Sequence, residues 1–329
     1  MTSWTRRACL ASCCLWLAAG CAGDGATEAD APATTTPEAR LLLPFDVEVD
    51  AQGRIYVADG ELHQVLRFDP ASGDVEVVVG NGRIGSAGDG GPAAEARINE
   101  PTGLALAPDG TLFIADFAEN RVRRVDPQGT IATLAELIGP AEVALDPTGR
   151  FLVVPLLGHV VFRIDLRTGK PTQLAGTGNA ATTGDGGPAR RAEVESPHGA
   201  AYDADGNLYI PDGASIRRID ARTGVITTIA TEVDAVKLLV VPGGGIYLTG
   251  SEPAGGTIRF LDPDGTIHAV AGTGFIGDDG EGGPAVKAEI LPSDIALAPD
   301  GALILSQTEP EPAVRRIDLD TGIITTLLR

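Results

Sequence analysis

The sequence predicts an all-β chain folded as a six-bladed β-propeller, in which each blade is a four-stranded antiparallel sheet. Gly and Pro number 43 and 23 of the 329 residues, and Val, Ile and Thr recur in short runs, a composition typical of strands joined by turns. A unit of four such runs occurs six times, and a glycine-rich phrase occurs three times at intervals of 96 residues. A β-helix repeat would be shorter, a sandwich would not show six units, and a leucine-rich solenoid would show a ladder of Leu and Asn.

The repeating unit is clearest in residues 101–135. It begins with Pro-x-Gly and contains four alternating apolar runs, at 101–106, 112–116, 121–126 and 131–135. Asp-Gly, Pro-Gly and Thr-Gly turns separate the runs, which is typical of antiparallel strands joined by hairpins. The six units start at Pro44, Pro101, Pro140, Pro197, Ala235 and Pro292. Such units fit a radial propeller, which leaves only short, protected sheet edges.

The glycine-rich phrase fills every long interval between units, so the propeller is expected to have three long Gly-rich connections between blades. Its copies are residues 88–93, 184–189 and 280–285, and the second position is acidic (Asp89, Asp185, Glu281). Its glycines suit a backbone with positive φ, and the following Pro suits the first position of a helical turn. The acids are expected to partner that helical turn or to bind Ca²⁺. No phosphate loop is predicted, because no Gly-Lys-Ser/Thr follows.

The densest acidic stretch contains Asp278, Asp279 and Glu281, which form the candidate metal site of these connections. Carboxylate and carbonyl oxygens are the ligands that Ca²⁺ prefers. The signal for Ca²⁺ or another divalent metal is weak, because one carboxylate per loop is too few and no loop has an EF-hand spacing. No cofactor is predicted.

The unit resembles the NHL repeat over residues 44–329. The resemblance rests on Pro-x-Gly in the first run, Gly-x-Leu-Phe-Ile-Ala-Asp at 110–116 and Arg-Arg-Val-Asp at 123–126. The glycine-rich phrase is similar to the inter-blade connection of exported bacterial NHL proteins, which implies an exported NHL-repeat lipoprotein. A WD40 propeller is disfavoured, because neither Trp lies in the domain. The units differ at the end of the second run, where three have Asp (Asp59, Asp116, Asp212) and the others have Pro155, Gly250 and Gln307.

The N-terminal segment is predicted to direct export. Residues 1–20 have the Arg pair, apolar stretch and small-residue end of a signal peptide, with Sec export favoured over the twin-arginine route. Residues 17–21 (Leu-Ala-Ala-Gly-Cys) resemble a lipoprotein box, which implies lipidation of Cys21; plain secretory cleavage is the alternative. Residues 21–39 then form the lipidated Cys and a disordered tether without bulky apolar residues, followed by the propeller at 40–329. We expect a membrane-anchored protein facing the periplasm or the cell exterior.

All four Cys residues lie in that segment, so the propeller is expected to have no disulfide. The net charge is −20, with the acids spread along the chain, which argues against nucleic acid and gives no basic patch for anionic lipid. The sequence contains neither Gly-x-Ser-x-Gly nor His-Glu-x-x-His. We expect a monomer whose partner is an unidentified protein or a small polar ligand.

Arginines recur at one register of the third run, as the pairs Arg123-Arg124, Arg217-Arg218 and Arg315-Arg316. Adjacent strand residues face opposite sides, so one member of each pair points to a given neighbour. An anion-binding ring is one interpretation. We favour pairing with Asp59, Asp116, Asp212 and nearby turn acids, because a feature of every repeat belongs to the scaffold.

The starts of the first runs line the mouth of the propeller channel and differ from unit to unit. The candidate ligand-binding residues there are Asp46, Thr102, Glu142, His198, Lys237 and Asp294. Positions that depart from a repeat can carry a binding site without disturbing the fold. This set is therefore expected to bind a small polar ligand or a divalent metal. Hydration of the channel is the alternative. The other histidines, His63, His159 and His268, show no ligand spacing.

The preferred function is a ligand- or protein-binding module or scaffold. The alternative is a metal-dependent hydrolase or lyase at the channel mouth, since some six-bladed lactonases and lyases hold a metal or a catalytic His there. A purely structural envelope protein is the third class. The last unit already has its fourth run, at residues 322–329, so the ends of the domain are expected to abut, with residues 41–43 bracing the final blade.

Overall fold

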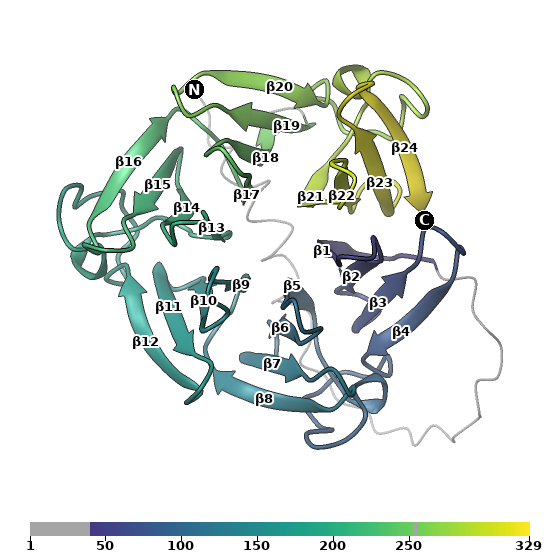
Figure 1. Cartoon of the computed structure of the whole chain (residues 1–329), viewed down its shortest axis with the longest axis horizontal. Coiled ribbons are helices and arrows are strands. Elements are labelled where there is room, and N and C mark those ends of the chain that lie inside the picture. The colour runs from purple at the N-terminus through teal and green to yellow at the C-terminus, as the bar shows by residue number, and fades with distance from the viewer. Residues whose placement is uncertain (1–39, 253–254) are drawn as a thin grey trace, which may run out of the picture. The chain divides into compact units, whose positions relative to one another are not determined.

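The computed structural model describes residues 40–252 and 255–329, and it confirms the six-bladed propeller (Figure 1). Each blade is one antiparallel sheet of four strands that are consecutive in the sequence. The predicted signal peptide, Cys21 and the tether lie outside the described residues. In the part of the chain that is described, no helix is long and apolar enough to cross a membrane.

The strands of the first three blades follow the predicted runs. Blade 1 has β1 (Pro44–Val49), β2 (Ile55–Asp59), β3 (Gln64–Phe68) and β4 (Val75–Val79). Blade 2 has β5 (Pro101–Leu106), β6 (Leu112–Asp116), β7 (Arg121–Val125) and β8 (Ile131–Glu136). Blade 3 has β9 (Ala144–Leu145), β10 (Phe151–Leu156), β11 (Val160–Asp165) and β12 (Lys170–Ala175).

The other three blades have the same order. Blade 4 has β13 (Ala201–Tyr202), β14 (Leu208–Asp212), β15 (Ser215–Ile219) and β16 (Ile226–Thr231). Blade 5 has β17 (Lys237–Val240), β18 (Ile246–Glu252), β19 (Gly255–Leu261) and β20 (Ile267–Ala271). Blade 6 has β21 (Pro292–Leu297), β22 (Leu303–Gln307), β23 (Ala313–Asp318) and β24 (Ile323–Leu328).

Two first strands are shorter than the sequence predicts. β9 and β13 have two residues each, and Pro140 makes only an isolated bridge to Leu156. In blade 3 the carboxylate of Glu142 accepts the backbone N–H of Val143 at 2.8 Å, a local bond of the kind that competes with strand pairing.

The long connections each contain one 3₁₀ turn after the glycine-rich phrase: η1 (Ala93–Glu95), η2 (Ala189–Arg191) and η3 (Ala285–Lys287). The Pro of the phrase is the residue before the turn rather than its first residue. Pro92, for example, has an extended backbone (φ −61°, ψ 130°). The acids of the phrase make no side-chain cap to these turns, so the predicted helix-terminus role is wrong.

An even number of antiparallel strands returns the chain to the side from which it entered a blade. All inter-blade connections and the β2–β3 type of turn therefore lie on one face, which we call the connection face. The β1–β2 and β3–β4 types of turn lie on the opposite face, the turn face. Residues 41–43 enter blade 1 from the connection face.

Six apolar clusters form the core, one at each interface between neighbouring blades. A fully buried Leu or Ile contributes about 1.5–3 kcal/mol. Five of these interfaces are also bridged by the chain. In the described part of the chain, the sixth, between blades 1 and 6, has no connecting segment and no shared strand, so noncovalent contacts hold it. We call this interface the seam.

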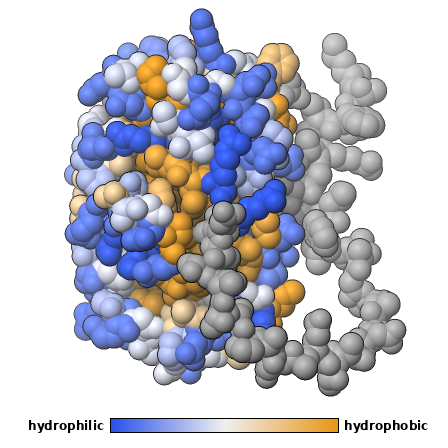
Figure 2. Space-filling model, turned by 90° about the vertical axis from the view of Figure 1, so that its right-hand side faces the viewer, coloured by the Kyte–Doolittle hydropathy of each residue, from blue (hydrophilic) through white to orange (hydrophobic). Residues whose placement is uncertain are grey.

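The seam cluster contains Leu41, which is 1% exposed and packs with blade 6 residues such as Ile304 and Val314. Leu41 thus supports the expected bracing of the final blade. Leu42 is 37% exposed, and the backbone amides of Leu42 and Leu43 donate to Asp59 of their own blade. On the outer wall, on the side where blades 1 and 6 meet, Figure 2 shows apolar surface flanked by hydrophilic side chains.

Candidate functional site

The first arginine of each pair lies buried near the rim and joins its own blade to the preceding connection. Arg123 is fully buried, with Nη2 at 2.5 Å from Asp89 of the connection and Nη1 at 3.2 Å from Asp116 of β6. Arg217 repeats this arrangement with Asp185 at 2.6 Å and Asp212 at 2.9 Å. Planar guanidinium groups suit such two-sided pairing. We call these arrangements the rim latches.

The outer acid of each latch also binds the fourth strand of the blade that carries the arginine. Asp89 accepts the backbone N–H of Thr133 at 3.0 Å, and Asp185 accepts that of Thr228 at 2.9 Å. Burial alone would raise the pKa of Asp89, but the bonds from Thr133 and the charge of Arg123 together lower it. The inner acid differs, because burial raises the pKa of Asp116 to about 6 despite Arg123.

The third latch departs from the other two. Gln307 occupies the position that Asp116 and Asp212 occupy in the other two latches. Glu281 lies 3.7 Å from Arg315 Nη2, and this nitrogen makes no hydrogen bond. Burial lowers the pKa of Arg315. Blade 6 is therefore held to its connection less tightly than blades 2 and 4.

The latches confirm the expected pairing of the arginines with Asp116 and Asp212. The expectation for Asp59 is wrong, because Arg67 pairs with Glu76 at 2.7 Å and Asp59 accepts amides of the incoming chain. The second arginines face turn acids, as Arg316 does with Asp300 at 2.9 Å.

A second set of charges lies at the axis, where the first strands of all six blades contact one another in a closed ring. The third residue of each unit faces this axis, and the six equivalent positions hold Asp46, Gly103, Glu142, Gly199, Lys237 and Asp294. In blades 1, 2 and 6 a β-bulge precedes this residue. Bulges turn a side chain away from the regular alternation.

Lys237 reaches across the axis and joins three blades. Its Nζ contacts Glu142 and lies 3.2 Å from Asp46 Oδ2. Lys237, Asp46 and Glu142 are all buried. Asp294 lies beside them, because its Oδ2 accepts the backbone N–H of Val47 at 3.1 Å. We call Asp46, Glu142, Lys237 and Asp294 the axial cluster.

Glycines at the two remaining positions make room for the cluster. A Cβ at Gly103 would lie 2.6 Å from Glu142 Oε1, and a Cβ at Gly199 would lie 2.9 Å from the backbone oxygen of Val236 and 3.6 Å from Lys237 Cδ. A side chain at either position would collide with the neighbouring blade. The ring of six positions is therefore filled by its own charged side chains.

Carboxylates outnumber cations at the axis. Burial raises the pKa of Asp46, although Lys237 opposes the shift. Burial and then the charge of Asp46 raise the pKa of Asp294 to about 7. Glu48, two residues after Asp46 on the same side of β1, has a pKa raised well above its usual value by burial and by both aspartates. The excess of buried carboxyl groups at the axis therefore favours their protonated forms.

The structure brings together four of the six predicted site residues. Thr102 instead donates to the backbone oxygen of Pro140 at 3.3 Å. His198 is half-buried, and its pKa is lowered by burial and by the neighbouring His159 rather than by the axial acids. Both are the second residue of their unit, which points away from the axis. Sequence reasoning missed Glu48, which the two-residue strand period from Asp46 could have found.

Two of the other three histidines, His63 and His159, occupy equivalent places in the repeat. His63 and His159 lie 96 residues apart, and each accepts a backbone N–H of the following connection, from Glu100 at 3.3 Å and Ser196 at 3.2 Å. Gly176 has φ +83°, and a Cβ there would lie 2.3 Å from the backbone oxygen of His159. These histidines therefore fasten the connections.

Among residues 40–252 and 255–329, no three His, Cys, Asp or Glu side chains are arranged to hold a metal ion. Asp278 pairs with Arg329 at 3.5 Å, and Glu281 accepts the backbone N–H of Thr326 at 3.0 Å. At the axis, an ammonium group already lies between the carboxylates. Metal binding at either place stays a prediction.

Comparison with known proteins decides the family. The family model of the teneurin NHL domain matches residues 69–145 and 168–243, somewhat less than half of the chain. Teneurin-3 of Danio rerio is 34% identical over 197 residues, which cover 54% of this chain and 7% of that protein. The chain is an NHL-repeat β-propeller. It corresponds to a small part of the length of the teneurins that it matches.

Solved structures support the fold of this NHL propeller. A protein of unknown function from Bacteroides thetaiotaomicron superposes with a TM-score of 0.63 at 15% identity, covering 84% of this chain and 70% of that one. The nidogen/laminin complex gives 0.59 at 14% identity over 80% and 89%. Virginiamycin B lyase from Staphylococcus aureus gives 0.57 at 14% identity over 88% and 86%. At this identity the likeness concerns the fold alone.

The connection face of the NHL propeller carries exposed apolar side chains in its third long connection. Phe275 and Val286 have no large apolar counterpart in the other two long connections, whereas Ile276 matches Ile84, which is 59% exposed. In the third long connection, Phe275 (60%), Ile276 (46%) and Val286 (48%) are exposed. The second connection has Asn179, Ala180 and Arg190 at the same places, and the first has Arg83, Ile84 and Ala94. The third connection is therefore the most apolar of three loops with the same local fold.

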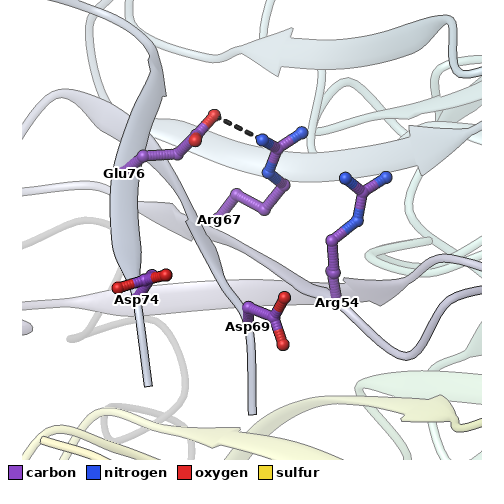
Figure 3. A pocket seen from close by; sticks show the side chains of 5 residues that line it. All are labelled: Arg54, Arg67, Asp69, Asp74 and Glu76. Atoms are coloured by element: carbon purple, nitrogen blue, oxygen red, sulfur yellow. Dashed lines mark ion pairs between the residues drawn. The ribbon is translucent and has the colours of Figure 1, made fainter. Parts of the chain in front are cut away.

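A polar pocket of about 180 Å³ lies on blade 1, lined by Arg54, Arg67, Asp69, Asp74 and Glu76 (Figure 3). Its arginines are already paired, Arg67 with Glu76 at 2.7 Å and Arg54 with Asp50 at 2.6 Å. The other two acids of the pocket bind their own turn, since Asp69 accepts the backbone N–H of Ala71 at 2.8 Å and Asp74 accepts the hydroxyl of Ser72 at 2.8 Å.

Proposed function

We propose that this NHL propeller is an exported, lipid-anchored binding or scaffold module that contacts its partner through the connection face. The observation that carries the proposal is the third long connection, where three large apolar side chains are exposed in a loop whose two counterparts are more polar. Exposed apolar groups that depart from a repeat are better explained by contact with a partner than by the scaffold.

The structural neighbours include both a complex and an enzyme, so fold alone does not choose between the classes. The axial cluster favours binding over metal-dependent catalysis. Lys237 places its ammonium against Asp46 and Glu142, the carboxylates that a divalent metal would need. Retention of Ca²⁺, Zn²⁺ or Mg²⁺ by the purified protein, lost in Glu142→Ala, would favour the hydrolase or lyase alternative.

The anchor rests on the sequence before Cys21 and on the 18 residues between Cys21 and Arg40. A flexible tether of that length spans roughly 25 Å, enough to hold a propeller close to a membrane. The test is fatty-acid labelling of the full chain in a bacterial host. The wild type should be labelled and partition into detergent, whereas Cys21→Ser should not. Cleavage of the wild type without labelling would support plain secretion.

The binding surface is tested by photo-crosslinking from single positions of the full chain in its host. A photoreactive residue at position 275 should give a discrete crosslinked product. The same residue at position 179, in the matched loop of the second connection, should not. The swap Phe275→Asn, Ile276→Ala, Val286→Arg, which copies the second connection, should abolish contact without unfolding the protein. Equal products from positions 275 and 179 would count against the proposal.

A further inference from the structure

The seam between blades 1 and 6 has a buried carboxyl pair at its axial end. Asp46 comes from β1 and Asp294 from β21, at equivalent positions of neighbouring blades. The two strands lie side by side, and Asp294 Oδ2 accepts the N–H of Val47, the residue after Asp46. Within residues 40–252 and 255–329, no connecting segment bridges this interface of the ring, so noncovalent contacts hold it closed.

One oxygen of this pair lacks a partner. Asp46 Oδ2 accepts from Lys237, whereas Asp46 Oδ1 is buried and makes no hydrogen bond of good geometry, with the N–H of Leu104 and the side chain of Asp294 nearby. A buried oxygen without a donor costs about 1–3 kcal/mol, and more for a charged group. The side chains of Asp46 and Asp294 lie within hydrogen-bonding reach of each other, so a protonated carboxyl of Asp294 would supply the missing donor.

The charges around the pair also favour a bound proton. The groups that face it are Glu48 on β1, Glu142 before β9 and Lys237 on β17. β5 and β22, which also pack against β1, contain no charged residue. β2 carries Asp59, which accepts the amides of Leu42 and Leu43. One ammonium therefore faces four carboxyl groups, and like-charged carboxyls in one site do not all ionise.

We propose that Asp46 and Asp294 share one proton across the seam, so that the contact between the first and last blades loosens as the solution becomes alkaline. The proton donates a hydrogen bond to the orphaned oxygen and removes the repulsion between two carboxylates. When the proton is lost, the buried oxygen of Asp46 again lacks a donor and the two carboxylates repel each other. Both effects weaken the contact between blades 1 and 6. The seam is thus a pH-sensitive closure of the ring.

The sign follows from the direction of the pKa shift. The pKa of Asp294 is raised from 3.8 to about 7. A carboxyl with a raised pKa contributes stability that is fully present below about pH 4 and is lost as the pH rises through about 7. Opening of the seam should therefore increase between pH 6 and pH 8.5.

The test is amide hydrogen exchange of the full chain as a function of pH, corrected for the intrinsic pH dependence of exchange. The peptides of β1 and β21 should lose protection about tenfold relative to the peptide of β5 between pH 6 and pH 8.5, since one pKa unit corresponds to a factor of ten. An unchanged ratio in the wild type would by itself overturn the proposal.

The matched variants are Asp294→Asn and Asp300→Asn. A carboxamide at position 294 donates to Asp46 and accepts from Val47 without titrating, so Asp294→Asn should remove the pH dependence of the seam. Asp300 lies on the same blade and pairs with Arg316 at the surface, so Asp300→Asn should leave the dependence unchanged. If the protection of β1 and β21 still fell with pH in Asp294→Asn, a shared proton would be contradicted. If that variant does not fold, the protection of β1 and β21 relative to β5 in the wild type decides.

Discussion

The rim latches and the axial cluster are both sets of buried charges, but only the latches repeat. Each complete latch places one guanidinium between two carboxylates of its own blade and the preceding connection. The axial cluster draws single residues from blades 1, 3, 5 and 6, with glycines in the other two blades. The repeated charges fasten each of these blades to the connection before it, whereas the unrepeated ones link blades across the ring and carry excess negative charge.

The outer acids of the latches and the axial Asp294 respond to pH in opposite directions. The outer acids of the latches have lowered pKa values, so their contribution to stability is lost as the pH falls through their pKa values, below about 4. Asp294 has a raised pKa of about 7, so its contribution is lost as the pH rises. Asp116, with a pKa of about 6, acts in the same direction as Asp294. Stability should therefore be greatest in mildly acid solution.

The largest expected effect comes from breaking a latch. Arg217→Leu leaves Asp212 buried without its counter-charge and should lower the free energy of unfolding by about 3–5 kcal/mol, measured by chemical denaturation. Arg218→Leu is the matched control on the same strand, because Arg218 is 30% exposed and pairs with Asp220 at 3.4 Å. That control should cost less than about 1 kcal/mol. Similar losses in both variants would refute the structural role of the latch.

Removal of the axial cation should have a smaller effect that depends on pH. Lys237→Met leaves Asp46 and Glu142 without an ammonium and should cost about 2–3 kcal/mol at pH 8. The loss should shrink at pH 5, because Asp294, with a pKa of about 7, then carries a proton and the cluster has less negative charge for a cation to offset. Denaturation at the two pH values measures the difference. A loss that is the same at both would show that the axial acids do not titrate in this range.

The smallest effect tests the close packing at the axis. Gly103→Ala places a Cβ 2.6 Å from Glu142 Oε1, and overpacking of this kind costs about 1–3 kcal/mol. Gly158 has no atom within 4 Å of such a Cβ, so Gly158→Ala should change stability by less than about 0.5 kcal/mol. Thermal unfolding of the pair compares them directly. A tolerated Ala at position 103 would mean that the axis is looser than described.

The sequence predicted the fold well because its repeat is periodic and many of its turns are marked by Gly. The runs predicted for blade 2 agree with β5 to β8 within one residue. The site was predicted less completely. Alternation along a strand separates Asp46 from Phe45, but the bulges and the shortened β9 and β13 shift which residue faces the axis. Asp89 and Arg123 lie 34 residues apart, and nothing local in the sequence relates them.

The most direct test of the account is the titration of the Asp294 carboxyl, followed by ¹³C NMR of the full chain with labelled aspartate. The account predicts a midpoint near pH 7 for Asp294, with Asp89 remaining ionised down to below its usual range. Asp294→Asn assigns the signal by removing it. If Asp294 instead titrates near pH 4, like an exposed aspartate, the axial cluster holds no proton and the contrast between rim and axis fails.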